Sequence, residues 1–235
     1  MFSATAAYYD LIYSRFKDYG READAIAAIL RAQDPRCTTV LDVACGTGEH
    51  ARALAARGFQ VDGTDLDPSF IQIASRKHPA GRFVAADMCD FHLDREYDAV
   101  LCLFSSIGYA RTLDRVRQAL ACVRDHVTPG GTILVEPWFP PGVLDPARVA
   151  TNVGEGDGVR VTRVSRVAID GRISRLLFEY EISDAAGTRS VSEVHELGLF
   201  TTDELLAAFR GVGLDVRYDP AGLMDRGLFI ARRAA

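Results

Sequence analysis

The chain has 235 residues, of which 48% are apolar and 25% are charged, and its formal net charge is -5. This length suits one large domain, or one domain with an insertion, and the composition is that of a globular protein. The acidic balance argues against a general nucleic-acid-binding protein, which would carry a basic excess. No apolar run approaches the roughly 20 residues that span a membrane, and the first residues do not have the pattern of a signal peptide.

Five cysteines are present, an odd number, and no two of them have Cys-x-x-Cys spacing. A disulfide framework or a zinc site is therefore not expected, and we predict no metal. Reduced thiols in a cytoplasmic protein are the simplest interpretation.

In its first 140 residues the chain alternates between apolar runs and helical patterns. The runs are typical of buried strands and lie at 38–44, 59–66, 81–88, 97–104 and 130–139. Helices are expected at 21–33 and 48–57, from Pro68 after the capping residue Asp67, and after Thr112. This alternation predicts a doubly wound, Rossmann-like α/β fold with a parallel sheet. Right-handed crossovers then place the loops that follow the strands along one edge, where ligands bind.

Beyond that point the pattern changes to strand-like segments separated by the turns "DGR" and "DAAGT". These predict antiparallel hairpins, with a loop at "GEGDG", residues 154–158. Thr201 and Glu204 have the spacing of a capping box, so a helix resumes there and two strands close the chain. We therefore predict an α/β domain made of residues 1–144 and 201–235, and an antiparallel β insertion at 145–200 that covers the acceptor site.

The segment Gly46–Ala51 fits the loose pattern G-x-G-x-x-G/A between a strand and a helix. That pattern is weak alone, because any tight turn of this kind needs glycine for its dihedral angles. Two acids follow at the ends of later strands. Asp65 could accept hydrogen bonds from both ribose hydroxyls, and Asp87 could accept one from an exocyclic amine such as that of adenine.

A third acid, Asp42, lies inside the first strand, four residues before Gly46. It would repel a pyrophosphate at short range, whereas a cationic ligand reverses the sign of the interaction. S-adenosyl-L-methionine carries a sulfonium and an ammonium and has no phosphate, so it fits. A nicotinamide-dependent oxidoreductase and a non-catalytic cofactor-binding protein remain alternatives on the same loop.

The segments "VLDVACGTGEHA", "VDGTDLDPSFIQIA", "FVAADMCDF" and "PGGTILVEPW" resemble the successive motifs of class I S-adenosylmethionine-dependent methyltransferases. The resemblance implies a seven-stranded, mostly parallel sheet and this cofactor. Together with the loop itself, it predicts a set of cofactor-binding residues: Tyr19, Asp42, Ala44, Gly46, Gly48, Asp65, Leu66, Asp87, Met88 and Leu103.

A narrower resemblance runs nearly end to end. "YYDLIYSRFKDYGREA", "LCLFSSIGY", "VEPWF", "VSEVHELGLF" and "DRGLFIARR" are similar to bacterial N,N-dimethyltransferases that finish dTDP-3-amino-3,6-dideoxyhexoses of the desosamine and mycaminose type in antibiotic pathways. This implies N-methylation of a dTDP-linked deoxyaminosugar, and relatives suggest a homodimer. Another small amine or a hydroxyl remains open as the acceptor.

Methyl transfer from a sulfonium is an in-line displacement, so the protein mainly orients the nucleophile and excludes water. Tyr13 and Tyr109 are the candidate catalytic residues, because the resemblance places both beside the transferred methyl. Some relatives carry histidine where Tyr109 stands. The predicted substrate contacts are Tyr9, Glu136, Trp138, His195 and, by resemblance, Arg226. A run of arginines in the insertion could meet a diphosphate or form a solvated face: Arg160, Arg163, Arg166, Arg172 and Arg175.

Overall fold

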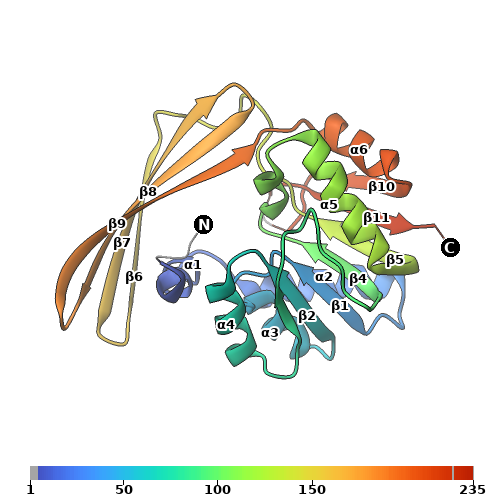
Figure 1. Ribbon diagram of the computed structural model, residues 1–235, viewed down its shortest axis with the longest axis horizontal. Helices are drawn as coiled ribbons and strands as arrows, with labels where there is room; N and C mark the ends of the chain where they lie inside the picture. Colours follow the sequence, from blue (N-terminus) through green and yellow to red (C-terminus); the bar gives the residue numbers. More distant parts are fainter. Residues whose placement is uncertain (1–4, 224, 235) are drawn as a thin grey trace.

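The computed structural model describes residues 5–223 and 225–234, which form two separate sheets (Figure 1). The larger sheet has seven strands in the order β10-β11-β5-β4-β1-β2-β3. Its strands are β1 Thr39–Val43, β2 Gln60–Asp65, β3 Phe83–Ala85, β4 Tyr97–Cys102, β5 Val127–Val135, β10 Leu214–Asp219 and β11 Leu228–Arg233. Strands β1 to β5 pair in parallel, and β10 and β11 join the edge antiparallel. The predicted seven-stranded, mostly parallel sheet is confirmed.

Helices cover both faces of this sheet, because its central strands are apolar on both sides. Val40 of β1 packs in the cluster under α2 and α3, and its neighbour Leu41 packs in the cluster under α5 and α6. The helical segments are η1 Ala6–Tyr8, α1 Tyr9–Tyr13, α2 Tyr19–Gln33, α3 Glu49–Ala55, α4 Pro68–Lys77, η2 Ser106–Ala110, α5 Leu113–Asp125 and α6 Thr202–Gly211. In the described part of the chain no helix is long and apolar enough to cross a membrane.

The predicted starts of α4, α5 and α6 are correct, whereas α2 starts at Tyr19, two residues before the predicted residue 21. The Asp67 carboxylate accepts from the Ser69 N–H at 2.9 Å, and Pro68 follows at the first helical position. Thr201 and Glu204 form the expected capping box of α6. Strand β3 is much shorter than the predicted 81–88, because it is an edge strand that pairs with β2 over only three residues.

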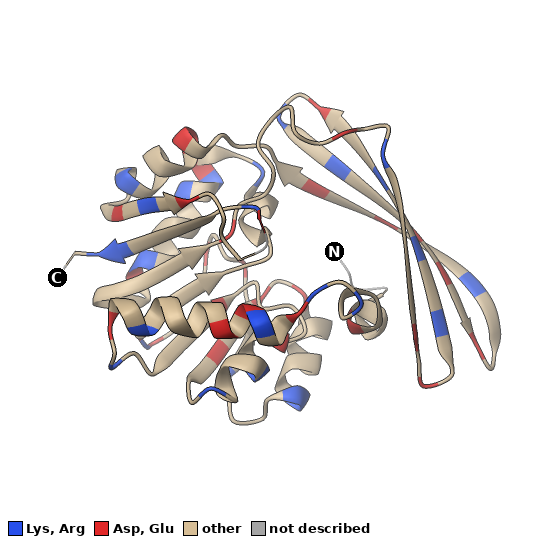
Figure 2. Cartoon of the chain, turned by 180° about the vertical axis from the view of Figure 1, so that it is seen from behind, with Lys and Arg blue, Asp and Glu red and all other residues tan. Residues whose placement is uncertain are grey.

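The smaller sheet contains four long antiparallel strands in the order β6-β7-β8-β9 and stands beside the α/β part (Figure 1). Its strands are β6 Val149–Gly156, β7 Val159–Asp170, β8 Ile173–Asp184 and β9 Gly187–Gly198, all within the predicted insertion. Arginines and acidic residues both occur along these strands (Figure 2). The inner face of this sheet packs against α1, where Ile12 and Tyr13 join a cluster with Val161 and Phe178.

The predicted loop at 154–158 is wrong, since most of it belongs to β6 and only Asp157 and Gly158 form the turn. A Cβ atom on Gly154 would lie 2.3 Å from the carbonyl oxygen of Leu11 in α1. The glycine is therefore there for the close approach of a helix. Sequence alone does not distinguish that role from a flexible loop.

Candidate functional site

A cavity of about 1160 Å³ lies between the carboxyl edge of the parallel sheet and the inner face of the four-stranded sheet. A smaller pocket of about 40 Å³ lies at the glycine loop. The loops that follow β1 and β4 line these spaces and contain non-glycine residues with left-handed backbone: Ala44 at φ 58°, Phe104 at φ 51° and Ser105 at φ 65°. Such conformations are costly for residues with a side chain, and they cluster at functional sites.

The structure brings nearly all the predicted cofactor residues to these two spaces. Lining the larger cavity are Ala44, Gly46, Asp65, Leu66, Asp87 and Met88. Lining the smaller pocket, beside Ala44 and Gly46, are Tyr19, Asp42 and Leu103. Gly48 lines neither space. It has φ 78°, and a Cβ atom there would lie 2.9 Å from the Cβ of Ala74, so its position indicates a role in the turn and in the packing of α4.

Asp65, at the end of β2, holds the glycine loop in place. Its Oδ2 accepts from the Gly46 N–H at 2.8 Å, and its Oδ1 accepts from the Asp67 N–H at 2.9 Å. Burial raises the pKa of Asp65, and these backbone donors partly offset the increase. Each carboxylate oxygen has a further lone pair, so Asp65 can accept from a ligand hydroxyl while it keeps the loop fixed.

Asp87 follows β3 and is held by two donors. Its Oδ1 accepts from the Cys89 N–H at 2.9 Å, and its Oδ2 accepts from Arg115 at 2.7 Å. Partial burial alone would raise the pKa of Asp87, but these donors keep it below its usual value. The group is therefore an ionised acceptor at neutral pH, as recognition of an exocyclic amine requires.

Asp42 decides which cofactor the site fits. It is 1% exposed, and its Oδ2 has no hydrogen-bond partner among the residues that the structure describes. Burial, and then the charge of Asp65, raise its pKa to about 7. A buried carboxylate oxygen without a partner is costly unless a ligand supplies a donor or a positive charge. The ammonium end of S-adenosylmethionine provides both, so the residues present fit this cofactor.

The sequence did not predict a buried group of charged and polar side chains at the small pocket, formed by Lys17, Glu22 and His50. Lys17 donates to Glu22 Oε2 at 2.5 Å, and His50 Nε2 lies 2.8 Å from the same oxygen. Lys17 also lies over the rings of Phe104 and Tyr19, at 4.1 and 5.1 Å from their centroids. Helical spacing could have placed Glu22 on the buried face of α2, but not its partners from other segments.

Both candidate catalytic tyrosines line the larger cavity, Tyr13 from α1 and Tyr109 from η2. Tyr13 is 7% exposed and stacks on Tyr9 at 4.1 Å, and burial raises its pKa. The Tyr109 hydroxyl lies 3.1 Å from Nδ1 of His195. His195 is fully enclosed, and its Nε2 lies 3.4 Å from a carboxylate oxygen of Glu193. Burial lowers the pKa of His195, so the imidazole is neutral. Its Nδ1 can then accept a hydrogen bond from the Tyr109 hydroxyl.

The other predicted substrate contacts separate into two kinds. Trp138 and Arg226 line the cavity, along with Tyr9 and His195. The indole of Trp138 donates to Ser174 at 2.9 Å, and Arg226 donates to Ser105 at 3.2 Å. Glu136 lines neither space.

Glu136 instead supports the cavity from behind. It is fully buried, and its Oε2 accepts from the Phe104 N–H at 2.7 Å. In this position Glu136 holds the loop after β4, and its predicted contact with the substrate stays a prediction.

The five arginines of the insertion fall into two groups, those that line the cavity and those that do not. Arg163 and Arg166 line the cavity, and Arg163, 5% exposed, lies over the rings of Tyr13 and Phe178 at 4.8 and 4.6 Å. The remaining three make exposed ion pairs with acidic neighbours: Arg160 with Glu155, Arg172 with Glu204, and Arg175 with Asp170 and Glu196. Strand alternation could have placed Arg163 on the inner face beside Val161. Three more arginines of the lining were missed: Arg111, Arg115 and Arg148.

Comparison with known proteins agrees with this geometry. A family model described as a methyltransferase domain matches residues 40–131. A dTDP-3-amino-3,6-dideoxy-alpha-D-glucopyranose N,N-dimethyltransferase of Streptomyces fradiae is 39% identical over 95% of this chain and 89% of its own length. A dTDP-4-amino-2,3,4,6-tetradeoxy-D-glucose N,N-dimethyltransferase of Saccharopolyspora spinosa is 34% identical over 96% of this chain and 91% of its own.

A solved structure extends the similarity to three dimensions. It is that of CalS10, an amino pentose methyltransferase of Micromonospora echinaspora with S-adenosylmethionine bound. It matches with a TM-score of 0.85 and 36% identity and covers 100% of this chain and 98% of its own. The chain therefore belongs to the S-adenosylmethionine-dependent methyltransferases, in the family of the dTDP-aminosugar N,N-dimethyltransferases, and S-adenosylmethionine is its methyl donor.

Proposed function

We propose that this enzyme N,N-dimethylates the amino group of a dTDP-linked deoxyaminosugar. The observation that carries the proposal is the cavity of about 1160 Å³, which combines cofactor-side residues with a wall built from the four-stranded sheet. That wall comes from the insertion, and the alignments with the sugar N,N-dimethyltransferases extend over nearly the whole chain. Because the chain belongs to a methyltransferase family, we do not retain the alternative of a nicotinamide-dependent oxidoreductase.

The chemistry needs little more than orientation. The cofactor supplies an electrophilic methyl group. Held by Asp42, Asp65 and Asp87, the cofactor would give this methyl group to the lone pair of a neutral sugar amine; the carbon–sulfur bond would break with its electrons left on sulfur, and the methylated ammonium would release a proton to solvent. Tyr13 and Tyr109 accept N–H donors of the amine and aim its lone pair. His195 helps to orient the amine indirectly. Its Nδ1 accepts a hydrogen bond from the Tyr109 hydroxyl, so the lone pairs of the phenol oxygen remain free to accept a hydrogen bond from the amine.

Recognition of the nucleotide needs positive charge and stacking surfaces on the acceptor side. The cavity lining supplies the guanidinium groups of Arg111, Arg148 and Arg226, together with the rings of Trp138 and Phe139. Guanidinium groups match diphosphate oxygens in a bidentate way, and aromatic rings can stack on a base. These features support a nucleotide-linked acceptor over a small free amine.

The relatives act on sugars with the amine on different carbons, position 3 in one and position 4 in the other. We expect turnover on dTDP-3-amino- or dTDP-4-amino-dideoxyhexoses and none on the corresponding free sugars. An acceptor panel that also contains unlinked small amines and hydroxyl compounds tests this. Faster turnover on any unlinked amine would replace the nucleotide-sugar assignment with the broader alternative.

We further propose that two copies associate into a homodimer. The outer face of the four-stranded sheet leaves Val149, Val153 and Leu177 between 37% and 55% exposed, an apolar surface that a second copy would cover. Analytical ultracentrifugation of the wild type and of Leu177→Glu tests the idea. A dimer that Leu177→Glu dissociates is expected, and a wild-type monomer at micromolar concentration would contradict it.

A further inference from the structure

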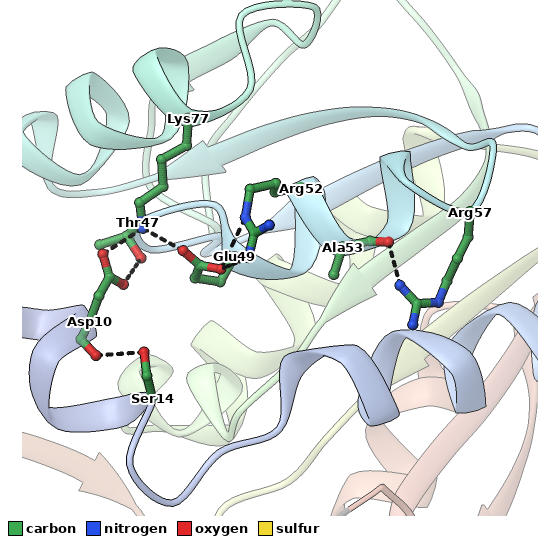
Figure 3. A network of polar contacts seen from close by, with 8 residues as sticks. All are labelled: Asp10, Ser14, Thr47, Glu49, Arg52, Ala53, Arg57 and Lys77. Atoms are coloured by element: carbon green, nitrogen blue, oxygen red, sulfur yellow. Dashed lines mark hydrogen bonds and ion pairs between the residues drawn. The ribbon is translucent and has the colours of Figure 1, made fainter.

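Helix α1 carries one acidic side chain, Asp10, whose carboxylate points toward the glycine loop and the end of α4 (Figure 3). Its Oδ1 accepts from the Thr47 hydroxyl at 2.6 Å, and its Oδ2 accepts from the Lys77 ammonium at 2.5 Å. Thr47 belongs to the glycine loop, and Lys77 is the last residue of α4. One carboxylate therefore joins three separate segments of the chain.

The partners of Asp10 are themselves fixed. Lys77 also donates to Glu49 Oε1 at 2.7 Å, and the other oxygen of Glu49 accepts from Arg52 at 2.7 Å (Figure 3). Thr47 is 2% exposed, whereas the side chains of Lys77 and Asp10 are 23% and 30% exposed. The contact is thus partly shielded from solvent and stronger than a surface pair, although salt will still screen it.

The opposite side of α1 is held by the four-stranded sheet. Leu11 packs on Gly154 and Gly156 of β6, where a Cβ atom would lie 2.3 and 2.8 Å from its carbonyl oxygen and its Cδ2 atom respectively. Helix α1 is therefore held on one side by Asp10 and its partners and on the other side by the contact of Leu11 with β6. Tyr9 contacts Phe70 at 5.1 Å and stacks on Tyr13, and all three line the large cavity with the cofactor-side residues.

We propose that Asp10 is a positioning residue. Its carboxylate ties α1 to the glycine loop, fixes Tyr9 and Tyr13 over the methyl donor, and sets the rate at which the spent cofactor leaves. The part that concerns the cofactor follows from the family assignment. The part that concerns orientation of the amine rests on the proposed function.

The test measures dissociation of S-adenosylhomocysteine by stopped flow in the wild type, Asp10→Asn and Lys77→Met. Loss of one charge-assisted contact of this exposure should speed dissociation about 3- to 10-fold. The double variant should gain no more than the larger single effect. Asp24→Asn is the matched control. It removes a carboxylate of α2 that pairs with Arg57 at 2.7 Å and has no part in holding α1, so it should leave dissociation unchanged.

A second readout needs no ligand. Hydrogen exchange of residues 9–13 in the cofactor-free protein should accelerate in Asp10→Asn, while exchange in β1 stays unchanged. Unaltered dissociation and unaltered exchange in both variants would overturn the inference, even if wild-type turnover on dTDP-aminosugars is normal. Absence of turnover in the wild type, with faster dissociation in Asp10→Asn, would instead overturn the acceptor assignment and support the role of Asp10.

Discussion

At the scale of single residues, Asp65 has two tasks that a substitution removes together. It pins the Gly46 N–H, and it presents its remaining lone pairs to the cavity. Asp65→Ala should therefore weaken S-adenosylmethionine binding by about 1–3 kcal/mol, through loss of charged hydrogen bonds. Isothermal titration calorimetry gives the value, and an affinity equal to that of the wild type would mean that Asp65 does not contact the cofactor.

Tyr109 should separate catalysis from cofactor binding. Tyr109→Phe removes the hydroxyl that lies 3.1 Å from His195 Nδ1 and leaves the ring in place. Turnover should fall roughly ten-fold because the amine loses one aligning contact, while cofactor affinity changes little. Steady-state rates at saturating cofactor provide the measurement. A parallel loss of cofactor affinity would instead place Tyr109 in the cofactor site.

Some of these residues could be predicted because their role follows from their position along a strand. Asp65 and Asp87 close successive parallel strands, and such positions meet at one edge of the sheet. Glu136 could not be assigned in this way, because its partner is the N–H of Phe104, a residue with unusual backbone geometry. Arg163 was named only as part of a charge run, because a count of arginines does not say which face of the strand each occupies.

At the scale of elements, the close fit of α1 on β6 makes a specific steric prediction. Gly154→Ala would place a methyl group 2.3 Å from the Leu11 carbonyl oxygen, so the helix must shift. We expect about 1–3 kcal/mol of destabilisation from overpacking, together with faster release of S-adenosylhomocysteine. Chemical denaturation and stopped flow measure the two effects.

The matched control is Gly211→Ala at the end of α6, where a Cβ atom would meet no atom of the described residues within 4 Å. That variant should be close to neutral in both measurements. If Gly154→Ala is equally neutral, the approach of α1 to β6 is looser than the structure indicates.

Periodicity predicted the long helices and the central strands well, because burial on one or both faces produces a regular pattern. It gave no sign of α1, a five-residue helix whose tyrosines and Leu11 pack against the four-stranded sheet. It also overestimated β3, since an apolar run does not show how far its single neighbour extends.

At the scale of the whole molecule, the buried Asp42 should make stability depend on pH. Its folded-state pKa is raised to about 7, while an unfolded aspartate titrates near 3.8. The contribution of protonated Asp42 to the free energy of unfolding is complete below about pH 4. It falls by up to about 1.4 kcal/mol per pH unit above that value and is lost as the pH rises through 7. Other carboxylates titrate in the same range, so the informative quantity is a difference between variants.

Denaturation of the wild type and Asp42→Asn at several pH values isolates this contribution. The free energy of unfolding of the wild type should fall relative to the variant between about pH 4 and 7. Saturating S-adenosylmethionine should reduce the gap, because its positive charge favours the ionised carboxylate over the neutral acid. Parallel pH profiles without cofactor would show that Asp42 is ionised throughout.

The relation between the two sheets could be predicted only in outline. The change from helix–strand alternation to hairpins indicates an insertion near residue 145, but the sequence does not show that its inner face closes the cofactor edge into one cavity. That closure depends on α1 and on the loops after β4 and β5, where local strain and long-range contacts outweigh local propensity.

The central claim is that the cavity between the two sheets holds a nucleotide-linked aminosugar for methylation. The most direct test is a time course of the purified enzyme with S-adenosylmethionine and a panel of dTDP-3-amino- and dTDP-4-amino-dideoxyhexoses, followed by mass spectrometry. For at least one sugar, a product with one added methyl group should appear first and then convert to a product with two. No methylated product from any sugar in the panel, from an enzyme that binds the cofactor, would contradict the account.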